Sequence, residues 1–244
     1  MLLNTFLLRQ VSTQRLKCDI KMLNAIRRET GASWLICQKA LQDSNNDLNV
    51  ARQAIRTLVD AKAKTICSGA QNLHEGLVGI FRNNSRLCIL KLACETDFVS
   101  KSPVFASLME KLAFRRLNQS HVPDKVINED EKDIFETSVS VNESIVVADV
   151  DVVEISPERY YGTYIHNRIH SFAGSIACVV ELKGSDPSND MANKFARHIA
   201  GLAPSSVMEL ENQPFLFGTD GKTVSDTLIL HGCSISRFKR FSMK

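Results

Sequence analysis

The sequence lacks any uninterrupted apolar run close to the roughly 20 residues that a membrane-spanning helix needs. It also has little excess charge, because 30 basic and 27 acidic side chains leave a formal net charge of only +3. A dedicated nucleic-acid binder usually carries a stronger basic stripe. These absences argue against a membrane span and against direct nucleic-acid binding, and they favour a protein partner.

Close cysteine spacing is missing as well, since none of the seven cysteines forms a Cys-x-x-Cys pair. Zinc sites and disulfide frameworks show closer spacing, so neither is expected here. Apolar neighbours around most of these cysteines are typical of small buried side chains in a reducing compartment. The histidines His166, His170 and His198 also lack the close spacing of metal ligands. We therefore expect neither a metal nor a cofactor.

Acidic residues are absent from the amino terminus before Asp19, whereas Arg9, Arg15 and Lys17 precede it. An amphipathic, basic and acid-poor segment is typical of a mitochondrial transit peptide. The alternative is a frayed tail. We expect residues 1–20 to be a transit peptide and the protein to be located in the mitochondrial matrix.

Residues 21–62 contain three stretches with helical spacing, which predict a small three-helix module. Gly31 is expected to end the first helix, while Ser33 and Asp47 are expected to cap the second and the third. The apolar positions of the second and third helices are Trp34, Cys37 and Leu41, followed by Leu48, Ala51, Ile55 and Leu58.

Such a small module resembles a ubiquitin-associated bundle, and a core of this size usually belongs to a docking unit. Trp34 and Leu35 follow the Gly31 turn and are candidate partner contacts. Alternatively, Trp34 closes the small core. An adaptor that binds ubiquitin-like proteins would explain this module but nothing beyond it.

The chain from residue 72 to residue 94 predicts two strands separated by the turn-forming sequence Asn83-Asn84-Ser85. The second strand is apolar on both faces except at Lys91, which indicates a central position in a sheet. We expect the two strands to form a hairpin.

The strand pattern stops at Glu95, and a helix start follows at Ser102 and Pro103. The short connection between them carries Asp97 and Phe98. A bulky aromatic side chain beside an acid, at the tip of such a connection, is suited to insertion into another surface. The alternatives are a core position for Phe98 and a capping role for Asp97.

The carboxy-terminal half predicts a second α+β unit. Its expected strands lie within 142–155, 160–165 and 175–182, with a loop or hairpin end at 167–174 and a helix over 189–201. The segment 118–145 shows no interpretable pattern. The fold class is therefore α+β: a three-helix, ubiquitin-associated-like bundle, then two subdomains (63–145 and 146–244) with antiparallel sheets flanked by helices.

Four blocks, in order, resemble the elongation factor Ts family. The first is LNAIRRETGASWLICQKALQDSNNDLNVARQAIR, and the second combines HEGLVGIF with CETDFVSKSPVF. The third is the short YIH sequence at 164–166, and the fourth is QPFLFGTDGKTVSDTL followed by SRFKRF. The resemblance extends from about residue 21 to 242, and the TDFV run is the family's most characteristic motif. One departure is Gly174-Ser175-Ile176-Ala177, where the family has Gly-Arg-x-Gly.

The resemblance implies a guanine nucleotide exchange factor rather than an enzyme, with mitochondrial elongation factor Tu as its GTPase partner. Asp97 and Phe98 would press between helices of the GTPase domain and displace the elements that hold magnesium and the phosphates. Thr96 and Val99 belong to the same motif, and we expect them to support the loop more than to contact the partner. His166 matches the histidine of the family's Tyr-x-His block and would contact a second region of the GTPase. The alternative is that its ring nitrogens find their hydrogen-bond partners within its own loop.

An enzyme that uses Cys94 as a nucleophile is the remaining alternative. A catalytic thiol needs a histidine or another group that lowers its pKa, and the sequence identifies none near Cys94.

Overall fold

The computed structural model describes residues 19–32, 34–69, 73–118, 128–184, 188–218 and 221–243. The chain divides into two compact units between Lys64 and Thr65. Residues 1–18 of the expected transit peptide and the expected cap Ser33 lie outside the described residues. Within the described ranges, no helix combines the length and apolarity that crossing a membrane requires.

The first unit contains α1 (Ile20–Thr30), α2 (Trp34–Asp43) and the start of α3 (Leu48–Gly69). Gly31 ends α1 in the left-handed conformation at φ 67°, as predicted. Asp47 caps α3, because its carboxylate accepts hydrogen bonds from the N–H groups of Asn49 and Val50 at 2.8 and 3.2 Å. The buried core consists of Leu23, Ile26, Ala32, Cys37, Ala40, Leu41, Ala51 and Ile55.

Leu58 does not belong to this core, although its spacing predicts it there. Its side chain is 41% exposed, whereas Ile55 is buried. Among the α3 residues whose side chains the structure describes, Ala51 and Ile55 are the ones buried in this core. The three helices are as expected, but the ubiquitin-associated label for them stays a prediction.

The second unit contains two antiparallel sheets, which confirms the α+β class. The first sheet has the strand order β3-β2-β1-β5, with β1 (Glu75–Arg82), β2 (Arg86–Cys94), β3 (Ile145–Glu154) and β5 (Ala173–Gly174). The second has the order β4-β6-β7, with β4 (Arg159–His166), β6 (Ile176–Gly184) and β7 (Cys233–Ser242).

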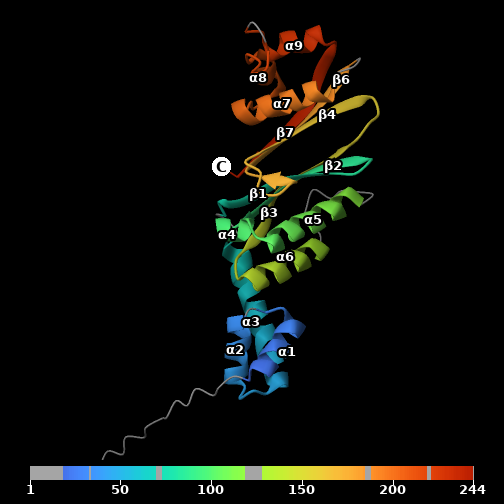
Figure 1. The fold of residues 1–244 in the computed structure, drawn as a ribbon. Helices are drawn as coiled ribbons and strands as arrows, with labels where there is room; N and C mark the ends of the chain where they lie inside the picture. Colours follow the sequence, from blue (N-terminus) through green and yellow to red (C-terminus); the bar gives the residue numbers. More distant parts are fainter. Residues whose placement is uncertain are drawn as a thin grey trace, which may run out of the picture. The chain divides into compact units, whose positions relative to one another are not determined.

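Helices flank both sheets (Figure 1). α5 (Pro103–Asn118) and α6 (Asn128–Val141) lie side by side against the first sheet, and α4 (Asp97–Ser100) is the single turn between β2 and α5. α7 (Asn189–Leu202), α8 (Val207–Asn212) and α9 (Val224–Leu230) pack with the second sheet.

β2 is central, as its apolar sequence predicts, and both of its faces are buried. Cys88, Leu90 and Leu92 face the core shared with α5. Leu87 and Ile89 face the opposite way, into a core that also contains residues of β4, β6 and β7. The second unit therefore has four layers, in which two sheets pack against each other between two layers of helices.

The chain crosses between the sheets at two places that the sequence did not reveal. β3 pairs with β2, so it belongs to the first sheet although the expected subdomain boundary falls at residues 145 and 146. The expected loop 167–174 contains β5, which pairs with Val78 and Gly79 of β1. We therefore propose that the first subdomain extends through β3 to Glu154.

His198 is fully buried on α7 and fixes the chain that follows α8. Its Nδ1 accepts a hydrogen bond from the N–H of Leu216 at 3.3 Å, so that nitrogen carries no proton. Its Nε2 then donates to the Gln213 side-chain oxygen at 3.0 Å. Burial lowers the pKa of His198 below its ordinary value of 6.5, with the Gln213 hydrogen bond acting in the opposite direction.

The free energy of unfolding should therefore fall as the pH drops below about 6.5, because the unfolded chain then takes up a proton that folded His198 refuses. One such group gives a slope of at most about 1.4 kcal/mol per pH unit. Urea unfolding between pH 8 and pH 5 measures this slope. His198→Gln, which cannot titrate, should have the shallower slope, and equal slopes in both proteins would contradict this assignment.

Candidate functional site

α4 forms because Thr96 caps it and because the next helix begins immediately afterwards. The Thr96 hydroxyl accepts a hydrogen bond from the N–H of Val99 at 3.3 Å. Ser102 caps α5 in the same way, since its hydroxyl accepts from the N–H of Phe105 at 3.2 Å. The capping group of α4 is thus Thr96, which excludes the alternative that Asp97 serves as the cap.

Phe98 and Val99 point in opposite directions from this single turn. Phe98 is 82% exposed and is the most exposed large hydrophobic residue among those described, whereas Val99 is 4% exposed. Val99 packs into the core of β1, β2 and α5. Phe98 is therefore not a core residue of this chain. Val99 holds the turn in place and has little surface left for a direct partner contact.

Asp97 forms an exposed ion pair with Lys101, whose Nζ lies 2.6 Å from the carboxylate. The hydrogen bond from Lys101 lowers the pKa of Asp97 below its ordinary value. Exposed pairs contribute little to stability. What the pair provides is an ionised carboxylate next to Phe98, so the tip offers an apolar ring and a charged acceptor together.

Two glutamates brace the connection that leads into α4. Glu95 accepts hydrogen bonds from the N–H of Ser144, at 2.7 Å, and from its hydroxyl. In return, Glu143 accepts from the N–H of Thr96 at 3.0 Å and from its hydroxyl at 2.7 Å. The neighbours Glu95 and Thr96 therefore face the neighbours Glu143 and Ser144, and each pair supplies one carboxylate that accepts two hydrogen bonds from the other pair. We call these four residues, Glu95, Thr96, Glu143 and Ser144, the carboxylate clamp.

Cys94 is buried at the end of β2, and its thiol donates to the carbonyl oxygen of Thr96 at 3.2 Å. Burial raises the pKa of Cys94 to about 12, and the charge of Glu143 acts in the same direction. A thiol in this environment stays protonated near neutral pH. The structure therefore opposes the enzyme alternative built on Cys94.

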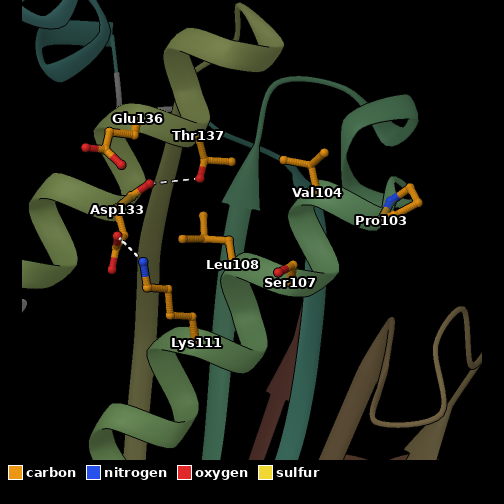
Figure 2. Close-up of a pocket in the computed structure, with 8 residues that line it drawn as sticks. All are labelled: Pro103, Val104, Ser107, Leu108, Lys111, Asp133, Glu136 and Thr137. Carbon is orange, nitrogen blue, oxygen red and sulfur yellow. Dashed lines mark hydrogen bonds and ion pairs between the residues drawn. The ribbon is translucent and has the colours of Figure 1, made fainter. Parts of the chain in front are cut away.

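An open groove of about 390 Å³ lies between α5 and α6 (Figure 2). Val104 and Leu108 give it an apolar side, and the ion pair between Lys111 and Asp133 spans it. Across the part of the chain that the structure covers, no cluster of three or more His, Cys, Asp or Glu side chains is arranged to hold a metal. The polar groups of the groove join two helices of the same chain.

The secondary candidates are exposed but lie in different parts of the fold. Trp34 and Leu35 open α2 in the first unit and are 43% and 72% exposed, so Trp34 does not close the small core. His166 ends β4 in the second unit, where its Nδ1 lies 3.3 Å from the hydroxyl of Tyr164. Residues 96–99 lie together on one connection, whereas His166 ends a strand of the other sheet in the same unit.

Sequence reasoning missed the second half of the carboxylate clamp. Glu143 and Ser144 lie 47 and 49 residues beyond their partners, in the segment that showed no interpretable pattern. It also missed that Arg197 lies between two aromatic rings, with its guanidinium carbon 5.5 Å from the Tyr164 ring and 5.3 Å from the Phe217 ring. No local spacing indicates either contact.

Comparison with known proteins connects this geometry to one family. Residues 95–211 match the family described as Elongation factor TS. The matched range begins at Glu95 of the carboxylate clamp and includes Phe98 and His166.

Curated relatives carry the same name. Elongation factor Ts, mitochondrial, of Bos taurus is 25% identical over 274 residues, covering 91% of this chain and 79% of the relative. Elongation factor Ts of Anaplasma phagocytophilum is 25% identical and covers 79% and 70%, and that of Rickettsia bellii is 28% identical and covers 75% and 61%. The part of the chain that matches the Elongation factor TS family, residues 95–211, therefore includes the exposed Phe98 turn.

Proposed function

We propose that this protein is the guanine nucleotide exchange factor of mitochondrial translation elongation, which binds elongation factor Tu and promotes the release of GDP so that GTP can bind. The single observation that carries this proposal is Phe98, a large apolar side chain that is 82% exposed on a turn anchored from both sides. An exposed aromatic side chain on a fixed turn is suited to fill a gap in a partner surface.

The exchange mechanism follows from linkage. A GTPase holds GDP partly through Mg²⁺, which demands near-ideal octahedral geometry, so a small displacement of its ligands weakens both the ion and the nucleotide. Insertion of Phe98 between two helices of the GTPase would cause such a displacement. The factor needs only to bind the nucleotide-free state better than the GDP state, and nucleotide binding then weakens its own hold by the same ratio.

The other residues of the proposed interface have supporting roles. Asp97 offers a charged acceptor beside Phe98, while Thr96 and Val99 fix the turn. Trp34, Leu35 and His166 are proposed secondary contacts with the same GTPase, and all three are exposed. This chain makes and breaks no covalent bond in the exchange, so we propose that it is not an enzyme and that it uses no cofactor.

The mitochondrial assignment has two supports. One relative is named as the mitochondrial protein of Bos taurus. The basic, acid-poor amino terminus has the composition of a transit peptide. We propose a location in the mitochondrial matrix, with no direct binding to nucleic acid or membrane.

A release assay tests the proposed function directly. Mitochondrial elongation factor Tu is loaded with fluorescent GDP, an excess of unlabelled GDP is added, and the rate of fluorescence loss is measured. We expect this rate to rise with the concentration of the full chain until it saturates. A release rate that is independent of the chain would refute the proposal.

A further inference from the structure

Glu143 occupies a position that the end of α6 defines. Asn142 adopts the left-handed conformation at φ 64°, and the N–H of Glu143 donates to the carbonyl oxygen of Ser138 at 3.1 Å. These two features form a Schellman motif, one of the common ways in which a helix ends. The backbone of Glu143 is therefore fixed relative to α6.

Both carboxylate oxygens of Glu143 bind one residue of the neighbouring connection. Oε2 accepts from the N–H of Thr96 at 3.0 Å, and Oε1 accepts from its hydroxyl at 2.7 Å. The same hydroxyl caps α4 by accepting from the N–H of Val99. Two contacts fix both the place and the rotation of Thr96, and Thr96 is the residue that caps the start of α4.

α5 and α6 form the frame to which both ends of α4 are attached. The ion pair between Lys111 and Asp133 joins the two helices (Figure 2). Arg115 adds contacts to Asp130 and Asp133. The first end of α4 meets this frame through Glu143, and the second end runs directly into the capped start of α5.

Phe98 depends on this frame because it has little packing of its own. With 82% of its surface exposed, the ring is held mainly by the backbone of α4. A wedge acts on its target only if it meets the target in a fixed orientation. We propose that Glu143 is a positioning residue, which sets the orientation of Phe98 through Thr96 and thereby the maximal rate of exchange. This inference rests on the proposed function.

The test measures GDP release over a range of concentrations of the full chain, which separates the maximal rate from the half-saturating concentration. Glu143→Ala should lower the maximal rate about tenfold, which corresponds to about 1.4 kcal/mol. Glu143→Gln keeps one acceptor oxygen and should give an intermediate rate. Glu136 is an exposed glutamate on α6, the helix that precedes Glu143, and Glu136→Ala should match the wild type. Circular dichroism checks that each variant is folded.

A double variant shows whether Glu143 acts on GDP release by positioning Phe98 or through an effect that is independent of Phe98. If Glu143 acts through Phe98, Phe98→Ala combined with Glu143→Ala should release GDP no more slowly than Phe98→Ala alone. Losses that multiply would overturn the inference, as would a Glu143→Ala variant with the wild-type maximal rate. In both cases the wild-type chain still accelerates release, so the proposed function stands. Only a wild-type chain without effect removes the function itself.

Discussion

Replacing Phe98 with alanine should slow the factor-dependent release of GDP from elongation factor Tu by about 30-fold, equal to about 2 kcal/mol at the threshold of an interface hot spot. The ring is 82% exposed, so its loss leaves the core of the protein intact. The expected signature is therefore a variant with the wild-type unfolding curve and a greatly reduced maximal release rate in the fluorescent GDP assay.

Phe114 provides the matched control for this experiment. It is also a phenylalanine, 55% exposed, on the adjacent helix α5. Phe114→Ala removes a similar exposed apolar area outside the α4 turn and should leave the release rate unchanged. If both variants lower the GDP release rate equally, the loss comes from removing any exposed aromatic side chain of this unit, and Phe98 has no special role in exchange.

Replacing Asp130 with alanine should have the largest effect on stability, about 3–5 kcal/mol, because it breaks a buried network of charges. Asp130 is fully buried at the start of α6 and pairs with both Arg115 and Arg116. Arg116 is also buried, and its Nε and Nη1 have no hydrogen-bond partner within the described ranges. Without Asp130, the Arg116 charge would be left buried without its carboxylate.

Urea unfolding compares this variant with Glu129→Ala. Glu129 is the neighbouring acid, but its side chain is exposed and lies 3.5 Å from Arg115. Exposed pairs contribute about 0–1 kcal/mol, so this control should unfold almost like the wild type. An Asp130→Ala variant that unfolds at the same urea concentration as the control would mean that water reaches the network and screens its charges.

The elements that the sequence predicted well are those whose pattern is local. β2 was identified as central because its apolar run has only Lys91 as an interruption. That lysine is accommodated because its Nζ donates to the carbonyl oxygen of Ser242 at 2.6 Å. The start of α5 followed from the adjacent Ser102 and Pro103, and the capping hydrogen bond is present. The exposure of Phe98 follows from its place in a short connection, although its residue type favours a core position.

α6 could not be predicted in this way, because its burial depends on charge pairing rather than on apolar spacing. Its first turn contains Glu129, Asp130 and Glu131, and such an acidic run is typical of a solvent-exposed segment. Asp130 is buried only because Arg115 and Arg116 of the preceding helix meet it. The contact between Glu143 and Thr96 depends in turn on this placement of α6, so the sequence does not indicate that contact either.

A bulge in β7 interrupts the alternation of apolar and polar residues by which a strand is recognised in a sequence. Ile235 pairs with Leu182 and Arg237 pairs with Glu181, so one extra residue lies between the two pairs. Ile235 and Phe238 consequently join the same core, despite a spacing of three that breaks the alternation expected of a strand. Only the resemblance of SRFKRF to the family pointed to this region, and it did not indicate a strand.

The core between the two sheets has a consequence for how a partner would be held. Val78, Leu87 and Ile89 of the first sheet are buried against Ala177, Val179 and Phe241 of the second. One continuous apolar layer therefore ties the turn that carries Phe98 to the strand that ends at His166. If both residues touch the GTPase, they act as a bivalent ligand with a stiff spacer. Engagement of one contact would then bring the other to its target at a high effective concentration, so two individually weak contacts would suffice for a firm grip that ends only when both are released together.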